Sequence, residues 1–155
     1  MKFIFPFLGK TREKYLDAGI TDYAKRLARF VQVEIVVLKS RSPESFPDTV
    51  FKQQEAQRLL DSVKQPSFIV ALDAGGRETD SPGLARLVEE WEEEGVQTIY
   101  FLVGGHLGLH EDIVQKADLV LSLSRLTFTH EMSRFILLEQ LYRAWTIKAG
   151  RKYHN

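Results

Sequence analysis

The sequence predicts an α/β protein in which a mostly parallel sheet of five to six strands carries helices on both faces. Short apolar runs alternate with longer segments whose apolar residues recur at helical spacing. Several of the apolar runs are nearly unbroken, which is typical of strands buried on both faces of a parallel sheet. The length of 155 residues suits one domain spanning 1–155.

In the first half of the chain each expected element has its own signal. Lys2–Leu8 is rich in Phe and Ile and predicts a buried strand. Arg12–Arg29 has apolar residues at helical spacing with basic residues on the other face. The β-branched run Val31–Leu38 favours a second strand. Asp48–Lys64 has helical periodicity and is stopped by a proline, and Ser67–Asp73 predicts a third, buried strand.

The second half continues the alternation. The glycine-bearing segment 74–80 is expected to be a loop, and Ser81 is expected to cap the helix that Pro82 opens. Thr129 has the same expected role for the last helix. The expected elements are the helix Ser81–Glu94, the strand Gln97–Val103, the short helix His110–Lys116, the strand Asp118–Ser122 and the long helix His130–Lys148.

A net charge of zero hides an uneven distribution. Residues 1–41 carry nine Lys/Arg and four Asp/Glu, residues 42–124 carry six and fifteen, and residues 125–155 carry six and two. Basic ends around an acidic middle indicate an anionic partner, such as nucleic acid. The alternative is that the five glutamates between residues 89 and 94 form a solvated helix face and create most of the contrast.

Several classes of site and location lack their signals. There are no cysteines, so disulfides and thiolate metal sites are excluded. The four histidines lack a zinc-binding pattern, and there is no G-x-S-x-G nucleophile motif. The apolar N-terminus is short and is expected to be a strand and not a signal peptide. No apolar run approaches the roughly 20 residues of a membrane span. We therefore expect neither a metal nor a membrane partner.

Three predicted strand ends mark the expected site, because ligands of parallel α/β sheets bind at the carboxyl ends of the strands. The first is Leu72-Asp73, the second is the glycine pair Gly104-Gly105, and the third is the polar loop Leu123–Phe128. Taken alone, the glycine pair favours a tight turn, and His130 favours a helix start. The polar loop is also typical of an ordinary connection.

The last third of the chain carries a specific resemblance. The block S-L-S-R-L-T-F-T-H-E-M-S-R-F-I-L-L-E-Q-L-Y-R-A-W, followed by G-R-K-Y-H, resembles the ribosomal RNA large subunit methyltransferase H family, of the SPOUT class of knotted methyltransferases. The resemblance extends over the whole chain. It implies a C-terminal trefoil knot, which is a rare fold feature, and a cytoplasmic homodimer.

The resemblance also implies S-adenosylmethionine as the cofactor, held largely by backbone groups. The implied cofactor-binding residues are Leu72, Gly104, Leu123, Ser124, Arg125, Leu126, Thr127 and Phe128. The implied substrate is a pseudouridine in a stem-loop of 23S large-subunit ribosomal RNA within the assembled ribosome, methylated at N3.

We expect the substrate side of the site to comprise His130, Arg143, Tyr153 and His154. The C-terminal tail serves either its own subunit's site or a partner subunit's site. Basic residues would hold RNA phosphates; the candidates are Lys10, Arg12, Lys14, Arg125, Arg134, Arg143, Lys148, Arg151 and Lys152. For Arg143 the alternative is an ion pair with Glu139 one helical turn away. Two other functions stay open: methylation of another RNA, such as transfer RNA, and ribosome binding without catalysis.

Overall fold

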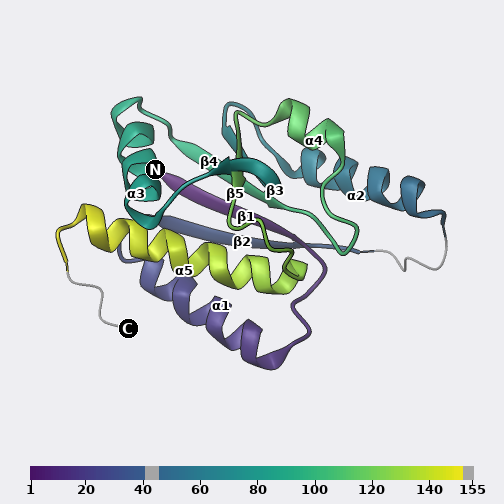
Figure 1. Ribbon diagram of the computed structural model, residues 1–155, viewed down its shortest axis with the longest axis horizontal. Coiled ribbons are helices and arrows are strands. Elements are labelled where there is room, and N and C mark those ends of the chain that lie inside the picture. The colour runs from purple at the N-terminus through teal and green to yellow at the C-terminus, as the bar shows by residue number, and fades with distance from the viewer. Residues whose placement is uncertain (41–45, 152–155) are drawn as a thin grey trace.

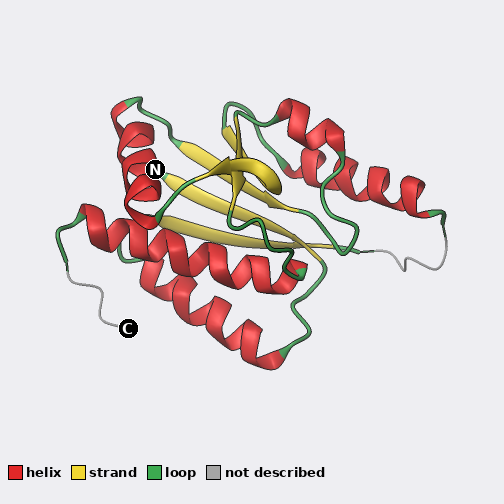
Figure 2. Ribbon diagram, viewed as in Figure 1, coloured by secondary structure: helices red, strands yellow, loops and turns green. Residues whose placement is uncertain are grey.

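The computed structural model describes residues 1–40 and 46–151 and contains one sheet in which every strand pair is parallel. The strand order is β2-β1-β4-β3-β5. The sheet runs through the middle of the molecule with helices on either side (Figures 1 and 2). The strands are β1 (Lys2–Leu8), β2 (Gln32–Leu38), β3 (Phe68–Glu78), β4 (Thr98–Val103) and β5 (Leu119–Ser122). The predicted fold class is thereby confirmed, with five strands in the described residues.

Two apolar layers sandwich the sheet. One face packs against α1 (Lys14–Leu27), α3 (Ser81–Glu93) and α5 (His130–Lys148), and its core includes Phe3, Phe5 and Phe101. The other face packs against α2 (Asp48–Ser62) and α4 (Glu111–Lys116). Strand residues alternate between the two layers because successive side chains point to opposite faces. This explains why the runs are nearly continuous in apolar residues.

The helix starts follow the expected capping chemistry, with one correction. Thr129 caps α5 as predicted, because its Oγ1 accepts the Met132 N–H at 3.2 Å. For α3 the cap is Asp80 and not Ser81: its carboxylate accepts the Gly83 N–H at 2.7 Å. A carboxylate one residue earlier reaches the free N–H groups of the first turn, which leaves the Ser81 hydroxyl to donate to Gln140.

The segment 74–80 was expected to be a loop, and this is wrong for most of its length. β3 continues through it to Glu78 and pairs with β5 a second time after a shift in register, so that Leu72 and Arg77 both face Leu121. Gly76 allows the close approach, because a Cβ there would lie 2.8 Å from the backbone of Val120. β3 therefore holds β5 next to the predicted site.

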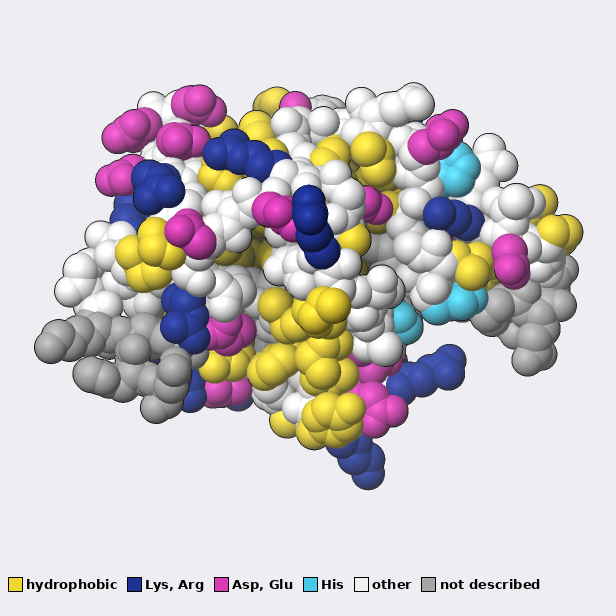
Figure 3. Space-filling view, viewed as in Figure 1, with side chains coloured by type: hydrophobic (Ala, Val, Ile, Leu, Met, Phe, Trp, Pro, Cys, Tyr) yellow, Lys and Arg dark blue, Asp and Glu magenta, His cyan; other side chains and the backbone are white. Residues whose placement is uncertain are grey.

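The acidic residues between 89 and 94 are exposed to solvent, as the alternative interpretation expected. The glutamates of α3 are exposed and form an acidic patch at the upper left of Figure 3. Within residues 1–40 and 46–151, no helix combines the length and apolar character needed to cross a membrane. The trefoil knot stays a prediction.

Candidate functional site

A cavity of about 610 Å³ opens where β4 and β5 end, beside the register shift of β3 that follows Leu72. Open α/β sheets bind ligands at this edge, and small-molecule sites have volumes of about 300–1,000 Å³. Seven of the eight residues predicted to hold a cofactor line the cavity: Leu72, Gly104, Leu123, Ser124, Leu126, Thr127 and Phe128. The strand-end argument therefore located a real concavity.

The turn after β4 explains the glycine pair. Gly105 and Gly108 form an isolated bridge, and the Gly108 N–H donates to the Gly105 carbonyl at 3.0 Å. A Cβ on Gly104 would lie 2.4 Å from the carbonyl carbon of Gly108, and Gly108 itself has a φ of +78°. No other residue type fits this turn at Gly104 without backbone movement, so the turn interpretation holds. The same turn also leaves bare backbone along the cavity.

The loop after β5 is organised by hydroxyl groups. Ser122 lies 4% exposed, and its Oγ donates toward the carbonyls of Ala74 (3.2 Å) and Ser124 (3.1 Å). The Ser124 Oγ in turn accepts the Leu126 N–H at 3.0 Å. These contacts fix the loop against the end of β3. The loop backbone between them borders the cavity, where a ligand can meet its N–H and C=O groups.

Arg125 is the eighth predicted contact, and its side chain lies outside the cavity. It is 85% exposed, and its Nε lies 2.8 Å from the carboxylate of Glu78 on the extended part of β3. The charged guanidinium stays in water beside an acid and does not pack against the apolar wall of the cavity. Its two neighbours along the chain do line the cavity, so only the Arg125 backbone runs along it.

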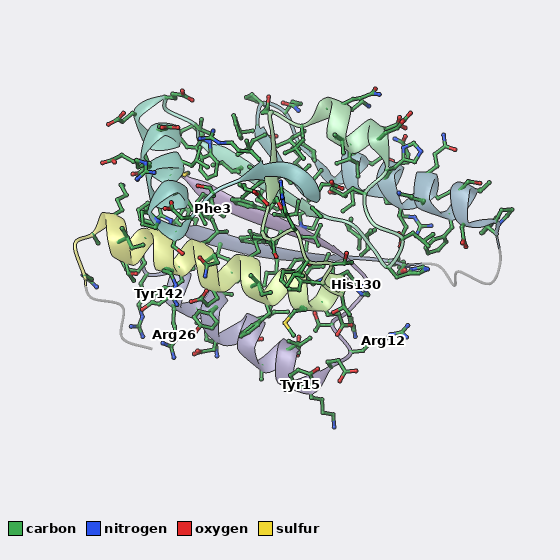
Figure 4. All side chains as sticks on the ribbon, in the orientation of Figure 1. Phe3, Arg12, Tyr15, Arg26, His130 and Tyr142 are labelled. Atoms are coloured by element: carbon green, nitrogen blue, oxygen red, sulfur yellow. The ribbon has the colours of Figure 1, made fainter. Side chains whose placement is uncertain are left out.

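His130 stands at the mouth of the cavity, at the first position of α5. Figure 4 shows it at the same end of the molecule as Arg12. Burial lowers the pKa of His130 below its ordinary 6.5; the positive charge of Arg134 acts in the same direction, and Glu131 opposes it. The imidazole is therefore neutral at pH 7. A neutral imidazole can accept a proton, which an imidazolium cannot.

The next two charged residues of α5, Glu131 and Arg134, both contact the segment that follows β1. The Glu131 carboxylate accepts the N–H groups of Arg12 (2.8 Å) and Glu13 (3.1 Å). Burial opposes the charge of Glu131, but these two hydrogen bonds, together with the nearby His130 and Arg134, outweigh it and lower the pKa. Arg12, which is exposed, is thus presented beside His130 by a fixed backbone.

Arg134 was expected to hold an RNA phosphate, and this is wrong. It is 1% exposed and donates to the carbonyls of Leu8 (2.8 Å) and Gly9 (3.3 Å), while its guanidinium lies 4.5 Å from the ring centre of Phe7. Burial lowers its pKa to about 10, so it stays charged at neutral pH. The helical spacing that placed Arg134 with the polar residues could not show that the β1–α1 turn covers it.

Arg143 lies on the same helix as His130, far from the cavity. Its Nη2 pairs with Glu139 at 2.8 Å, as the alternative interpretation expected. Thirteen residues of α-helix separate the two, which corresponds to ~20 Å along the axis. Lys148, another phosphate candidate, forms an ion pair with Glu92 and lies over the ring of Trp145. Tyr153 and His154 lie outside the described residues.

Two residues of the cavity wall were not singled out as ligands by the sequence. Asp73 follows Leu72 and accepts the Gly75 N–H at 2.8 Å, and His106 sits in the glycine turn. Their positions at strand ends were the only available signal. Within the described part of the chain, no cluster of three or more His, Asp or Glu side chains is arranged to hold a metal ion.

Comparison with known proteins identifies first the fold class of this chain and then its family. A solved structure titled a probable methylase family protein from Haemophilus influenzae Rd KW20 has the same fold, with a TM-score of 0.53 and 12% identity over 99% of this chain and 70% of that chain. The class is thus an α/β protein that shares the fold of that structure.

The family follows from the sequence relatives. The family model described as "Predicted SPOUT methyltransferase" matches residues 1–154. A ribosomal RNA large subunit methyltransferase H from Desulfotalea psychrophila is 43% identical over the whole of both chains, and one from Ruminiclostridium cellulolyticum is 39% identical over the same coverage. The chain belongs to the SPOUT methyltransferase family. The resemblance read from the sequence is confirmed.

Proposed function

We propose that this protein uses S-adenosylmethionine to methylate N3 of a pseudouridine in a stem-loop of 23S large-subunit ribosomal RNA, on the assembled ribosome. The observation that carries the proposal is the cavity at the strand ends, in a chain 43% identical throughout to a ribosomal RNA large subunit methyltransferase H. The same resemblance supports a single catalytic domain over residues 1–155, a C-terminal knot and a cytoplasmic location.

The cavity suits the cofactor. Its walls combine the apolar side chains of Leu72, Leu109 and Phe128 with bare backbone at Gly104 and along the loop after β5. Apolar walls suit an adenine ring, and backbone N–H and C=O groups suit its polar edge. When bound, the cofactor supplies an electrophilic methyl group. The glycine turn keeps space for it, because a side chain at Gly104 would displace the turn.

The residues around the cavity suit the acceptor chemistry. An imide nitrogen carries a proton, and it becomes a good nucleophile when that proton leaves. In the proposed reaction the proton at N3 passes to the neutral imidazole of His130, a nitrogen–carbon bond forms to the methyl group, and the carbon–sulfur bond breaks. His130 lines the cavity, and burial lowers its pKa, so its imidazole is neutral and able to accept the proton.

Geometry supports a homodimer. The axis of α5 from His130 to Lys148 is ~27 Å long, and its far end lies at the left of Figure 1. Arg151, the last described residue, follows that end in the chain. Two further residues of chain span at most ~7 Å, which is much shorter than the ~27 Å length of α5. If Arg143, Tyr153 and His154 serve the substrate, they serve the cavity of a partner subunit.

Exposed cations beside the cavity would hold the RNA. Lys10 and Arg12 follow β1 and are exposed, and they line the same hollow of the surface as His130. Figure 3 shows histidine and Lys/Arg side chains close together on the right of this face. Contacts to phosphates from such residues position an RNA without reading its sequence. Recognition of the base is then left to the cavity.

One experiment tests the proposed function. The protein is incubated with labelled S-adenosylmethionine and, separately, with assembled ribosomes, isolated ribosomal subunits and transfer RNA. We expect label in large-subunit RNA, with assembled ribosomes as the best substrate. Label in transfer RNA alone would contradict the proposal, and binding to ribosomes without any transfer of label would indicate a non-catalytic module.

A further inference from the structure

A second cavity, of about 990 Å³, lies between the turn after β1, the end of β2 and α2. It meets the first cavity at Gly105, His106 and His130, which line both. A ligand in the second cavity would therefore reach the same imidazole that borders the cofactor site. The proposed reaction described above uses no residue on the far wall of this cavity, which is the wall formed by α2.

That far wall carries a buried acid. Glu55 of α2 is 5% exposed, and its Oε2 has no hydrogen-bond partner among the described residues. Its carboxyl group packs against Gly105: a Cβ at that glycine would lie 2.5 Å from Oε2. A buried acceptor without a donor costs free energy, so its presence beside a cavity indicates a ligand that supplies the donor.

The electrostatics link this acid to His130 through one residue. Burial raises the pKa of Glu55, and the nearby charges of His106 and Arg58 oppose that shift. His106 also acts on His130, whose pKa it lowers. Glu55, His106 and His130 thus line one cavity, and His106 influences the pKa of both other groups. A ring that lies between Glu55 and His130 could meet both at once.

The remaining walls suit a nucleotide. The ring of the buried Phe51 lies 5.5 Å from the ring of His106, which is exposed and offers an aromatic surface for a base. The exposed side chains of Lys10, Arg12 and Lys39 line the rim. Cations at the rim and rings within are the arrangement that holds a phosphate outside and an unstacked base inside.

We propose that the second cavity receives the target pseudouridine and that Glu55 accepts a hydrogen bond from its N1–H, which makes Glu55 a specificity-determining residue. Pseudouridine is joined to the ribose through carbon, so its N1 keeps a hydrogen that uridine lacks. N1 and N3 flank the same C2 carbonyl, which lets Glu55 hold one nitrogen while His130 takes the proton from the other.

The carboxyl group can make this contact with little movement. The terminal torsion of a glutamate is broad, so a small rotation turns an oxygen from Gly105 toward the cavity. A site built to bond an N–H discriminates against an analogue that lacks it, because its buried acceptor is then left unpaired. Uridine at the target position is such an analogue. This inference rests on the proposed function, since it takes the methylated base as the ligand.

The test compares methyl transfer to two ribosome preparations, which carry either pseudouridine or uridine at the target position. The wild-type protein is expected to prefer pseudouridine by about 10- to 100-fold, the equivalent of one hydrogen bond to a charged group. Glu55→Leu is expected to lose most of this preference. Glu55→Gln, which keeps a carbonyl acceptor, is expected to retain part of it. Asp61→Leu is the matched control, because it removes an exposed acid from the same helix.

Cofactor binding and thermal melting are measured for every variant, so that a folding defect is recognised. A wild-type protein that methylates both ribosomes equally would overturn the inference without any variant. Unchanged preference in Glu55→Leu would overturn it as well. Failure of the wild-type protein to methylate either ribosome would instead contradict the proposed function.

Discussion

The guanidinium of Arg134 donates to the carbonyl of Leu8 at 2.8 Å and thereby ties α5 to the end of β1 across 126 positions of the chain. The Glu131 carboxylate adds a second tie to the turn that follows. Both contacts sit within one helical turn of His130. The N-terminal basic segment and the proposed proton acceptor are therefore held in one rigid unit.

Replacing Arg134 should destabilise the fold. Arg134→Met removes the donors to the carbonyls of Leu8 and Gly9, and we expect a loss of about 2–4 kcal/mol in the free energy of unfolding, since each unsatisfied buried acceptor costs about 1–3 kcal/mol. Denaturant titration measures it. The exposed Arg125→Met should stay within about 0.5 kcal/mol. Equal small losses in both variants would show that the buried hydrogen bonds contribute little.

His130 should set the acid side of the pH profile. Its lowered pKa keeps the imidazole neutral, so transfer is expected to persist above that pKa and to fall only at pH values below the ordinary 6.5. His130→Gln should lower kcat by about 10²–10⁴-fold with cofactor affinity nearly unchanged. His110→Gln, at the start of α4, is the control. Full activity in His130→Gln would exclude His130 as the proton acceptor.

The glycine turn should be essential for cofactor binding. In Gly104→Ala the new Cβ would meet the Gly108 backbone at 2.4 Å, and the turn must move away from the cavity. We expect at least about a tenfold loss of cofactor affinity by calorimetry, from about 1–3 kcal/mol of strain. The control Gly95→Ala adds a Cβ at a glycine of the same chain where no atom lies within 4 Å, although its φ is positive. It should bind the cofactor normally.

The distance along α5 predicts complementation between subunits. A variant lacking Tyr153–Asn155 and the variant His130→Ala should each be inactive alone. A refolded mixture of the two should regain transfer, because one cavity of the heterodimer has both an intact His130 and an intact tail from the partner. A mixture that stays inactive while forming heterodimers would place the tail outside the partner's site.

The sequence predicted the sheet and the cavity because apolar runs determine strands, and parallel strands end at one edge. It placed the α3 cap one residue late, since Asp80 and Ser81 have similar local signals. It ended β3 at Asp73 because a pair of glycines looks like a loop; the close approach of Val120 that extends the strand is a tertiary contact.

Buried charges were the hardest features to predict. Arg134 and Glu55 occupy helical positions where a charged residue usually faces water. Each is buried by a segment remote in the chain: the β1–α1 turn covers Arg134, and the glycine turn covers Glu55. The local periodicity of a helix carries no information about burial by a remote segment of the chain. The methyl donor and the RNA target came from the family resemblance and not from the residue pattern.

The central claim is tested most directly by nucleoside mass spectrometry of large-subunit RNA from ribosomes treated with the protein and S-adenosylmethionine. We predict one new methyl group, on N3 of a pseudouridine in a stem-loop. A methyl group on a ribose oxygen, on another base or on another RNA would contradict the account.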